Sequence, residues 1–241
     1  MRSGRPRVAC AVLTALVVLA PAAPLVAREH VILLHGLSRQ AGSMEPMAKA
    51  LREDGGYWTL NVGYPSSKKD IRALADEHVA PAVERCRKNG ATRIHFVTHS
   101  MGGILVRDYL ARTKPRELGR VVMLAPPNQG SEVVDRIGHW PAYRQLTGPA
   151  GQQLGTRKNA SYPRSLPAID FPCGIIAGSR TINWINSGMI EGRDDGKVSI
   201  ESTKAKGMTD HIVGPRTHPM IMRSKDSKAL TIRFLKQGRF R

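Results

Sequence analysis

The stretch of sequence on which the predicted fold depends most is Arg93-Ile94-His95-Phe96-Val97-Thr98, followed directly by His99-Ser100-Met101-Gly102-Gly103. Its first part is rich in apolar and β-branched residues and has the length of a strand, whereas residues 101–112 have helical spacing. Ser100 is therefore predicted to lie on a tight turn between a strand and a helix. Such a turn exposes the serine hydroxyl but strains the backbone, so small residues such as Gly102 and Gly103 must stand nearby.

Strands and helices alternate on both sides of this turn. Further strands are predicted at residues 31–34, 58–62, 121–125, 174–177 and 212–216. Further helices are predicted at residues 43–51, 70–88 with a kink at Pro81, and 224–235. This alternation predicts an α/β fold with a doubly wound, mostly parallel sheet and helices on both faces.

One connection is too long for an ordinary loop. Residues 126–172 separate two predicted strands and are rich in Gly, Pro, Ser and Asn, with some helical pattern near residues 133–143. Loops of this length in compact domains are usually functional excursions or disordered inserts. We expect an irregular, cap-like segment that shapes a pocket.

The N-terminus has the layout of a secretory signal. Arg2, Arg5 and Arg7 precede an apolar run over residues 8–20, and Pro and Ala follow up to Ala27. We expect residues 1–27 to be removed and the chain to be exported to the periplasm or medium; the alternative is an inner-membrane anchor. Residues 28–241 then fit one domain, since α/β domains often reach about 250 residues.

The chain is strongly basic. Loss of three arginines and no acids with residues 1–27 lowers the formal charge from +18 to +15. Such a field favours anionic partners, including an anionic membrane surface. The basic residues are scattered and lack interleaved aromatics, so no nucleic-acid binding is expected. Cys86 and Cys173 are expected to be buried thiols, with a single bridge as the alternative.

Three groups with complementary chemistry fall after predicted strands, where ligands collect in α/β sheets. Ser100 is a weak nucleophile unless an imidazole takes its proton, and His218 follows the last strand. His211 competes for this role but lies within the strand region. Asp195 is the preferred acid for orienting the imidazole, and its alternatives are Asp194, Asp170 and Asp210. The order Ser, Asp, His matches the nucleophile-elbow fold.

Stabilisation of an oxyanion requires two backbone donors. The start of the helix after Ser100 offers the N–H of Met101, and the loop after the first strand offers the N–H of Leu37. His35 is expected to brace that loop through ring hydrogen bonds, with direct proton transfer as the alternative. No phosphate-binding loop and no metal-ligand spacing is visible, so neither a cofactor nor a metal is predicted.

These motifs together resemble those of bacterial lipases and related esterases or acyl thioesterases of the α/β-hydrolase superfamily. The resemblance rests on His35-Gly36 after an apolar strand, His99-Ser100-Met101-Gly102-Gly103, Asp195-Gly196-Lys197-Val198-Ser199, and Thr217-His218. It covers most of residues 31–235. One position departs from the family motif, which usually begins with Gly where this chain has Thr98.

The resemblance implies hydrolysis of lipid or other acyl esters by a Ser100, His218 and Asp195 triad through an acyl-enzyme. An acyl thioesterase with the same triad is one alternative. A non-catalytic protein of the same fold that binds anionic envelope components is the other, because fold alone does not establish chemistry.

Overall fold

The structure is a computed structural model that describes residues 28–157, 161–181 and 187–241. The expected export segment, residues 1–27, lies outside this part of the chain. Within the described ranges, no helix combines the length and apolar character that crossing a membrane requires.

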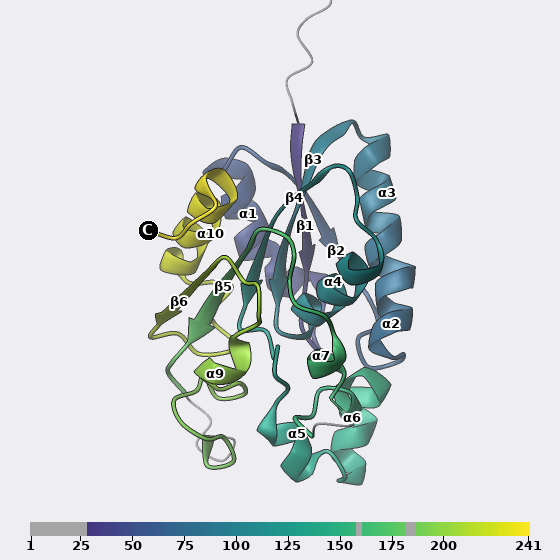
Figure 1. The fold of residues 1–241 in the computed structure, drawn as a ribbon, viewed down its shortest axis with the longest axis vertical. Coiled ribbons are helices and arrows are strands. Elements are labelled where there is room, and N and C mark those ends of the chain that lie inside the picture. The colour runs from purple at the N-terminus through teal and green to yellow at the C-terminus, as the bar shows by residue number, and fades with distance from the viewer. Residues whose placement is uncertain (1–27, 158–160, 182–186) are drawn as a thin grey trace, which may run out of the picture.

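The centre of the molecule is a sheet of six parallel strands in the order β2-β1-β3-β4-β5-β6 (Figure 1). The strands are β1 (Arg28–Leu34), β2 (Trp58–Val62), β3 (Ala91–His99), β4 (Leu118–Leu124), β5 (Cys173–Gly178) and β6 (Asp210–Gly214). The chain runs outward from β1 to β2 and then returns to β3 on the other side of β1. The order reverses between β1 and β3, which is where doubly wound sheets place ligands. The predicted fold class is confirmed.

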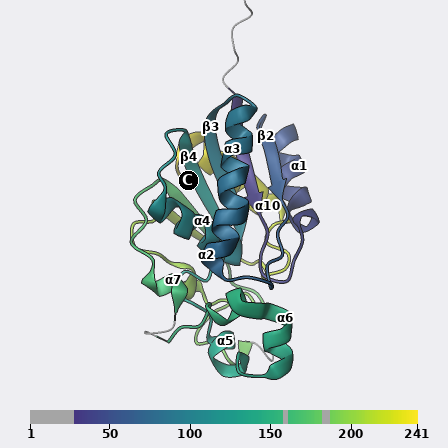
Figure 2. The same cartoon turned by 90° about the vertical axis from the view of Figure 1, so that its right-hand side faces the viewer.

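Helices cover both faces of this sheet (Figures 1 and 2). One face carries the 3₁₀ turn η1 (Ala41–Met44), α1 (Glu45–Glu53) and α10 (Lys225–Gln237). The other carries α2 (Ile71–Leu74), the π-helical turn η2 (Ala75–Val79), α3 (Ala80–Lys88) and α4 (Met101–Arg112). Pro81, where a kink is predicted, directly follows the π-helical turn over Ala75–Val79, and proline has no N–H for the carbonyl four residues earlier.

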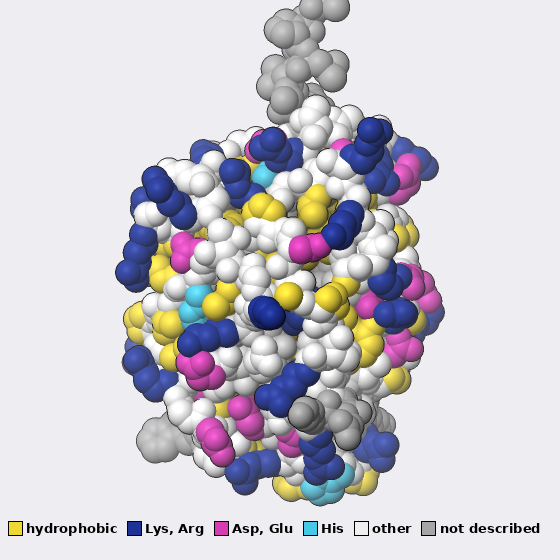
Figure 3. Space-filling view, in the orientation of Figure 1, with side chains coloured by type: hydrophobic (Ala, Val, Ile, Leu, Met, Phe, Trp, Pro, Cys, Tyr) yellow, Lys and Arg dark blue, Asp and Glu magenta, His cyan; other side chains and the backbone are white. Residues whose placement is uncertain are grey.

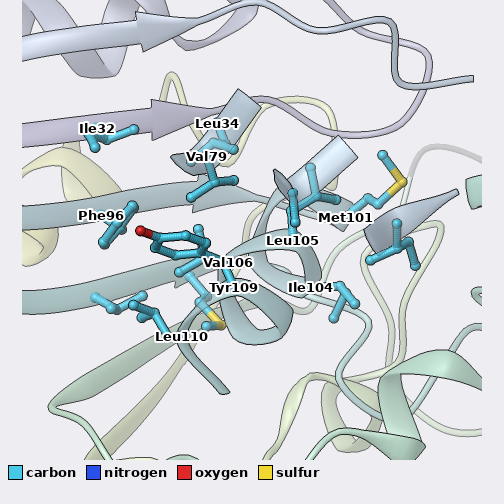
Figure 4. Packing of buried hydrophobic residues seen from close by; sticks show 14 of the residues in the cluster. Ile32, Leu34, Val79, Phe96, Met101, Ile104, Leu105, Val106, Tyr109 and Leu110 are labelled. Carbon is cyan, nitrogen blue, oxygen red and sulfur yellow. The ribbon is translucent and has the colours of Figure 1, made fainter. Parts of the chain in front are cut away.

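Helix α4 is the most deeply buried helix of the described chain. Every residue from Met101 to Leu110 is buried, because the sheet lies on one side and neighbouring helices and loops lie on the others. Figure 4 shows Ile104, Leu105 and Tyr109 packed with strand residues such as Phe96. This packing holds the start of α4, and with it the turn at Ser100, in a single position.

Residues 126–157 and 161–172 pass beyond the carboxyl ends of the strands (Figure 1). The segment is more helical than expected, with α5 (Glu132–Ile137), α6 (Pro141–Gln152) and α7 (Tyr162–Ser165). Buried Arg107 of α4 anchors it by donating to the Asn128 side-chain oxygen at 3.0 Å and to carbonyls of later residues of the segment. Burial lowers the pKa of Arg107 to about 10. The connection is therefore a packed layer over the sheet edge.

The last strand begins earlier than predicted, at Asp210, so His211 is part of β6. Cys86 and Cys173 are buried and unpaired with each other, and burial raises both thiol pKa values to about 12. Lysine and arginine are spread over the face shown in Figure 3, with acidic side chains between them.

Candidate active site

Ser100 lies on a strained turn at the end of β3. Its φ of 52° and ψ of −127° are rarely adopted by a residue with a side chain. Its N–H donates to the Leu124 carbonyl at 2.8 Å, and its own carbonyl accepts from Gly103 at 2.9 Å. Strand pairing and the first turn of α4 therefore hold the strained conformation together.

Glycines allow this turn to sit against the end of β1. A Cβ atom on Gly102 would lie 2.7 Å from the His35 carbonyl oxygen, and one on Gly36 would lie 3.0 Å from the Ser100 Cβ. A Cβ atom on Gly103 would lie 3.2 Å from the Thr98 hydroxyl oxygen. Gly103 therefore leaves room for Thr98, and the turn forms although the family's usual Gly is replaced there.

His218 links Ser100 to Asp195. Its Nε2 lies 3.0 Å from the Ser100 Oγ, and its Nδ1 lies 2.8 Å from Oδ2 of Asp195. His218 is 3% exposed and Asp195 is fully buried. An ionised carboxylate only accepts hydrogen bonds, so Nδ1 carries the proton and Nε2 is left to accept one from the serine hydroxyl.

The local backbone fixes the orientation of Asp195. Its Oδ1 accepts from the N–H groups of Lys197 at 3.1 Å and Val198 at 3.0 Å, which leaves Oδ2 for the imidazole. Its carbonyl also accepts from the His218 N–H at 2.9 Å. The acid and the imidazole are thus joined through both backbone and side chain, although they lie on different loops.

The other candidate acids have different partners. Asp194 accepts from the Ser187 hydroxyl at 2.7 Å and the Gly196 N–H at 2.6 Å, so it stabilises its own loop. Asp170 pairs with Lys114 on the surface, and Asp210 accepts from the Phe240 N–H at 2.7 Å. These contacts leave Asp195 as the acid that faces His218.

Histidines near the turn have distinct roles. The competing candidate His211 has its Nε2 2.9 Å from the Thr203 hydroxyl. His99 donates from Nε2 to the His218 carbonyl at 3.0 Å, and the two rings lie 4.8 Å apart. Burial, and then the neighbouring charge of His218, hold the pKa of His99 well below its usual value. His99 is therefore a neutral support beneath His218.

The loop after β1 is held by side chains that come later in the sequence. His35 donates from Nδ1 to the Gly36 carbonyl at 2.8 Å, and its Nε2 accepts from the Tyr64 N–H at 3.3 Å. The Tyr64 ring stacks on it at 4.0 Å, and the Tyr64 hydroxyl donates to the His35 carbonyl. Burial lowers the pKa of His35, which favours this neutral form. Tyr64 was not singled out by the sequence.

Backbone donors are available on both sides of Ser100. Met101 is the first residue of α4, where helical N–H groups have no intrahelical partner. Leu37 follows Gly36 and lines the cavity at Ser100. The next residue, Ser38, has a φ of 54°, and its N–H donates to the Ser66 hydroxyl at 2.9 Å. The loop is thus held in a strained conformation beside the serine.

The cavity at Ser100 is small, at about 60 Å³. Small-molecule sites usually occupy about 300–1,000 Å³, so the covering segment leaves little open space. A larger surface groove of about 1040 Å³, between α1 and α10, is lined by none of the candidate site residues. The cavity at Ser100 is lined by Leu37, Arg39, His99, Ser100, Pro127, Ser131, Val134, Tyr143, Leu154, Lys197, Val198 and His218.

Two cations on this wall were missed by the sequence analysis. Arg39 lies three residues after Gly36, and Lys197 lies two residues after Asp195. Both residues lie close in sequence to a predicted motif, Arg39 to His35-Gly36 and Lys197 to Asp195-Gly196. Closeness in sequence does not show which way a side chain points.

Comparison with known proteins places the chain in a family. The alpha/beta hydrolase family model matches residues 31–185, a range that contains Ser100 and ends before Asp195 and His218. A triacylglycerol lipase of Pseudomonas fragi is 30% identical over 115 residues, which are 46% of this chain and 38% of that lipase. The match therefore spans well under half of the lipase.

Solved lipases share the fold at low identity. The mature form of a Bacillus licheniformis lipase has a TM-score of 0.67 and 18% identity, covering 90% of this chain and 94% of that one. Lipase B of Aspergillus fumigatus has a TM-score of 0.67 and 17% identity, covering 87% of this chain and 53% of that one. The family model matches more than half of the chain. The strand order of this chain and its strained turn at Ser100 agree with that family. This chain belongs to the alpha/beta hydrolase family.

Proposed function

We propose that this chain is a serine hydrolase that cleaves carboxylic esters of lipids or other acyl compounds through an acyl-enzyme. The observation that carries the proposal is the hydrogen-bonded series from Ser100 Oγ through the His218 ring to Asp195. Burial of the acid and the imidazole strengthens their interaction, because little water competes with it.

In the first step, His218 Nε2 takes the Ser100 hydroxyl proton as Oγ bonds to the ester carbonyl carbon. The carbonyl oxygen becomes an oxyanion that accepts from the N–H groups of Leu37 and Met101. Asp195 remains ionised and stabilises the imidazolium that forms. Collapse of the intermediate breaks the bond to the alkoxy oxygen, which leaves as the alcohol with the proton held by His218.

In the second step, water takes the place of the alcohol. His218 accepts a proton from the water as its oxygen attacks the acyl carbon, and the same two N–H groups stabilise the second oxyanion. The acid leaves when the bond to Ser100 Oγ breaks and His218 returns the proton to that oxygen. The cycle consumes one water and leaves the protein unchanged.

A fluorophosphonate probe tests the nucleophile directly. It should label the native chain and fail to label Ser100→Ala. His218→Ala should abolish ester turnover, whereas the matched variant His211→Ala should retain it, since His211 lies in β6 and its ring contacts Thr203 rather than Ser100. Absence of labelling in folded native protein, or loss of turnover only in His211→Ala, would contradict the proposal.

The substrate is tested with esters graded by acyl length and a thioester matched to each. Both leaving groups can use the same machinery, so the ratio of their kcat/KM values separates an esterase from an acyl thioesterase. Export belongs to the same proposal, and N-terminal sequencing of protein collected outside the cytoplasm tests it. A start at Arg28 is expected, and an intact Met1 would contradict it.

A further inference from the structure

Two cationic side chains share the cavity wall with the proposed nucleophile. Arg39 comes from the loop after β1, and Lys197 comes from the turn that carries Asp195. Both line the cavity together with Ser100 and His218. Both positive charges help to lower the pKa of the buried His99, whose ring lies against that of His218.

Neither cation forms an ion pair in the described part of the chain, where other cations do. Lys69 pairs with Glu77 at 2.6 Å and Arg112 pairs with Asp108 at 2.6 Å. No ion pair or side-chain hydrogen bond is formed by Arg39 or Lys197 among the residues that the structure describes.

The two carboxylates on the turn that carries Lys197 bind other groups. Asp195 accepts from two backbone N–H groups and from His218. Asp194 accepts from the Ser187 hydroxyl and the Gly196 N–H. The charge of Asp195 partly opposes the lowering of the Lys197 pKa by burial, but no direct hydrogen bond or ion pair joins the two side chains in the described part of the chain.

The cations also repel one another. Partial burial and then the charge of Arg223 lower the pKa of Arg39. Lys197 is open to solvent, yet enough protein surrounds it for desolvation to lower its pKa, and Arg39 lowers that pKa further. Like charges held together in partly desolvated positions favour an anion between them.

We propose that Arg39 and Lys197 form an anion subsite beside Ser100, and that the preferred substrates are esters carrying a carboxylate or phosphate close to the scissile bond. This inference rests on the proposed ester hydrolysis. The contact to the anion does not change as the carbonyl is attacked, so it should stabilise substrate and transition state alike. Its effect should therefore fall mainly on KM rather than on kcat.

Matched pairs of water-soluble esters test the subsite without a lipid surface. The first pair is 1-butyroylglycerol and 1-butyroylglycerol 3-phosphate, which places the anion on the alcohol side. The second pair is ethyl hexanoate and ethyl hydrogen adipate, which places it on the acyl side. We expect kcat/KM to be about tenfold higher for the anionic member of at least one pair, as one charge-assisted contact provides.

Variants then assign the preference to the two residues. Arg39→Gln and Lys197→Gln should each lower the ratio of anionic to neutral kcat/KM by about threefold, and the double variant should remove the tenfold preference. Lys228→Gln removes the same charge from α10, outside this cavity, and should leave the ratio as it is in the native protein. Added salt should lower the native ratio, because a solvent-open subsite is screened.

The outcomes separate this inference from the proposed function. Folded native protein that hydrolyses no member of either pair and resists the fluorophosphonate probe would overturn ester hydrolysis itself. Native protein with equal kcat/KM values for the neutral and the anionic ester in both pairs would overturn only the anion subsite. An equal fall of the ratio in Lys228→Gln would also overturn it, since the preference would then reflect net charge.

Discussion

Asp195→Asn should inactivate the protein by reversing the direction of one hydrogen bond. Asp195 Oδ1 accepts from two backbone N–H groups, and only an oxygen can keep both bonds. The asparagine amide must therefore turn its NH₂ group toward His218 Nδ1, 2.8 Å from the present Oδ2 position. An NH₂ group donates, so the imidazole proton moves to Nε2, which can no longer accept the proton of Ser100.

The expected loss is about 10⁴-fold in kcat, the size seen when a triad imidazole is held in the wrong tautomer. That loss corresponds to about 5.5 kcal/mol of activation free energy. The free energy of unfolding should change by no more than about 1–2 kcal/mol, because the two backbone bonds remain. The assay combines ester turnover, thermal unfolding and the ¹⁵N chemical shifts of His218, which report its tautomer.

Asp194→Asn is the matched control. Asp194 accepts from Ser187 and Gly196 through Oδ1 alone, and an asparagine oxygen can keep both bonds. We expect its kcat to stay within about threefold of native, since no bond to His218 is altered. The reasoning would be refuted if Asp194→Asn lost activity while Asp195→Asn kept it. It would also be refuted if Asp195→Asn kept the Nδ1–H tautomer.

The remaining predictions concern packing and pH. Gly102→Ala should destabilise the fold by about 1–3 kcal/mol, because its Cβ would meet the carbonyl oxygens of Leu34 and His35 at 2.8 and 2.7 Å. Gly103→Ala should stay within about 1 kcal/mol of native, as helix propensity offsets its milder contacts; equal losses in urea titrations would contradict this. Unfolding free energy should decrease as pH falls below about 6.5, because the unfolded chain protonates His99 while the fold keeps it neutral. His99→Gln should reduce that slope by about one proton, or about 1.4 kcal/mol per pH unit, and an unchanged slope would count against the buried neutral form.

Local features were readable from the chain because they depend on neighbours in sequence. A strand directly followed by Ser100, two glycines and a helix defines the turn within about ten residues. The apolar periodicity that predicts the helices is equally local. The order of strands and helices then leaves few ways to build a parallel sheet.

Several expectations needed correction where distant contacts decide. The segment between β4 and β5 contains three helices, and Arg107 of α4 holds the chain on either side of α5 and α6 by donating to Asn128 and to the Pro163 carbonyl, contacts that the composition of the segment does not reveal. Thr98 stands where the family motif usually has Gly, and its side chain fits because Gly103 has none. The two residues face each other only after α4 has packed against β3 and β4. Tyr64 reaches His35 across 29 positions of sequence.

The sequence by itself determined the fold class, the strained serine turn and the set of groups available for chemistry, since hydrophobic period and glycine placement act over a few residues. Only the tertiary structure decided which acid faces His218. Asp194 and Asp195 are adjacent and chemically identical, but the turn directs one toward its own loop and the other toward a ring 23 residues away. The same packing brings Arg39 and Lys197 to one cavity, because their directions depend on contacts between segments that lie far apart in the chain.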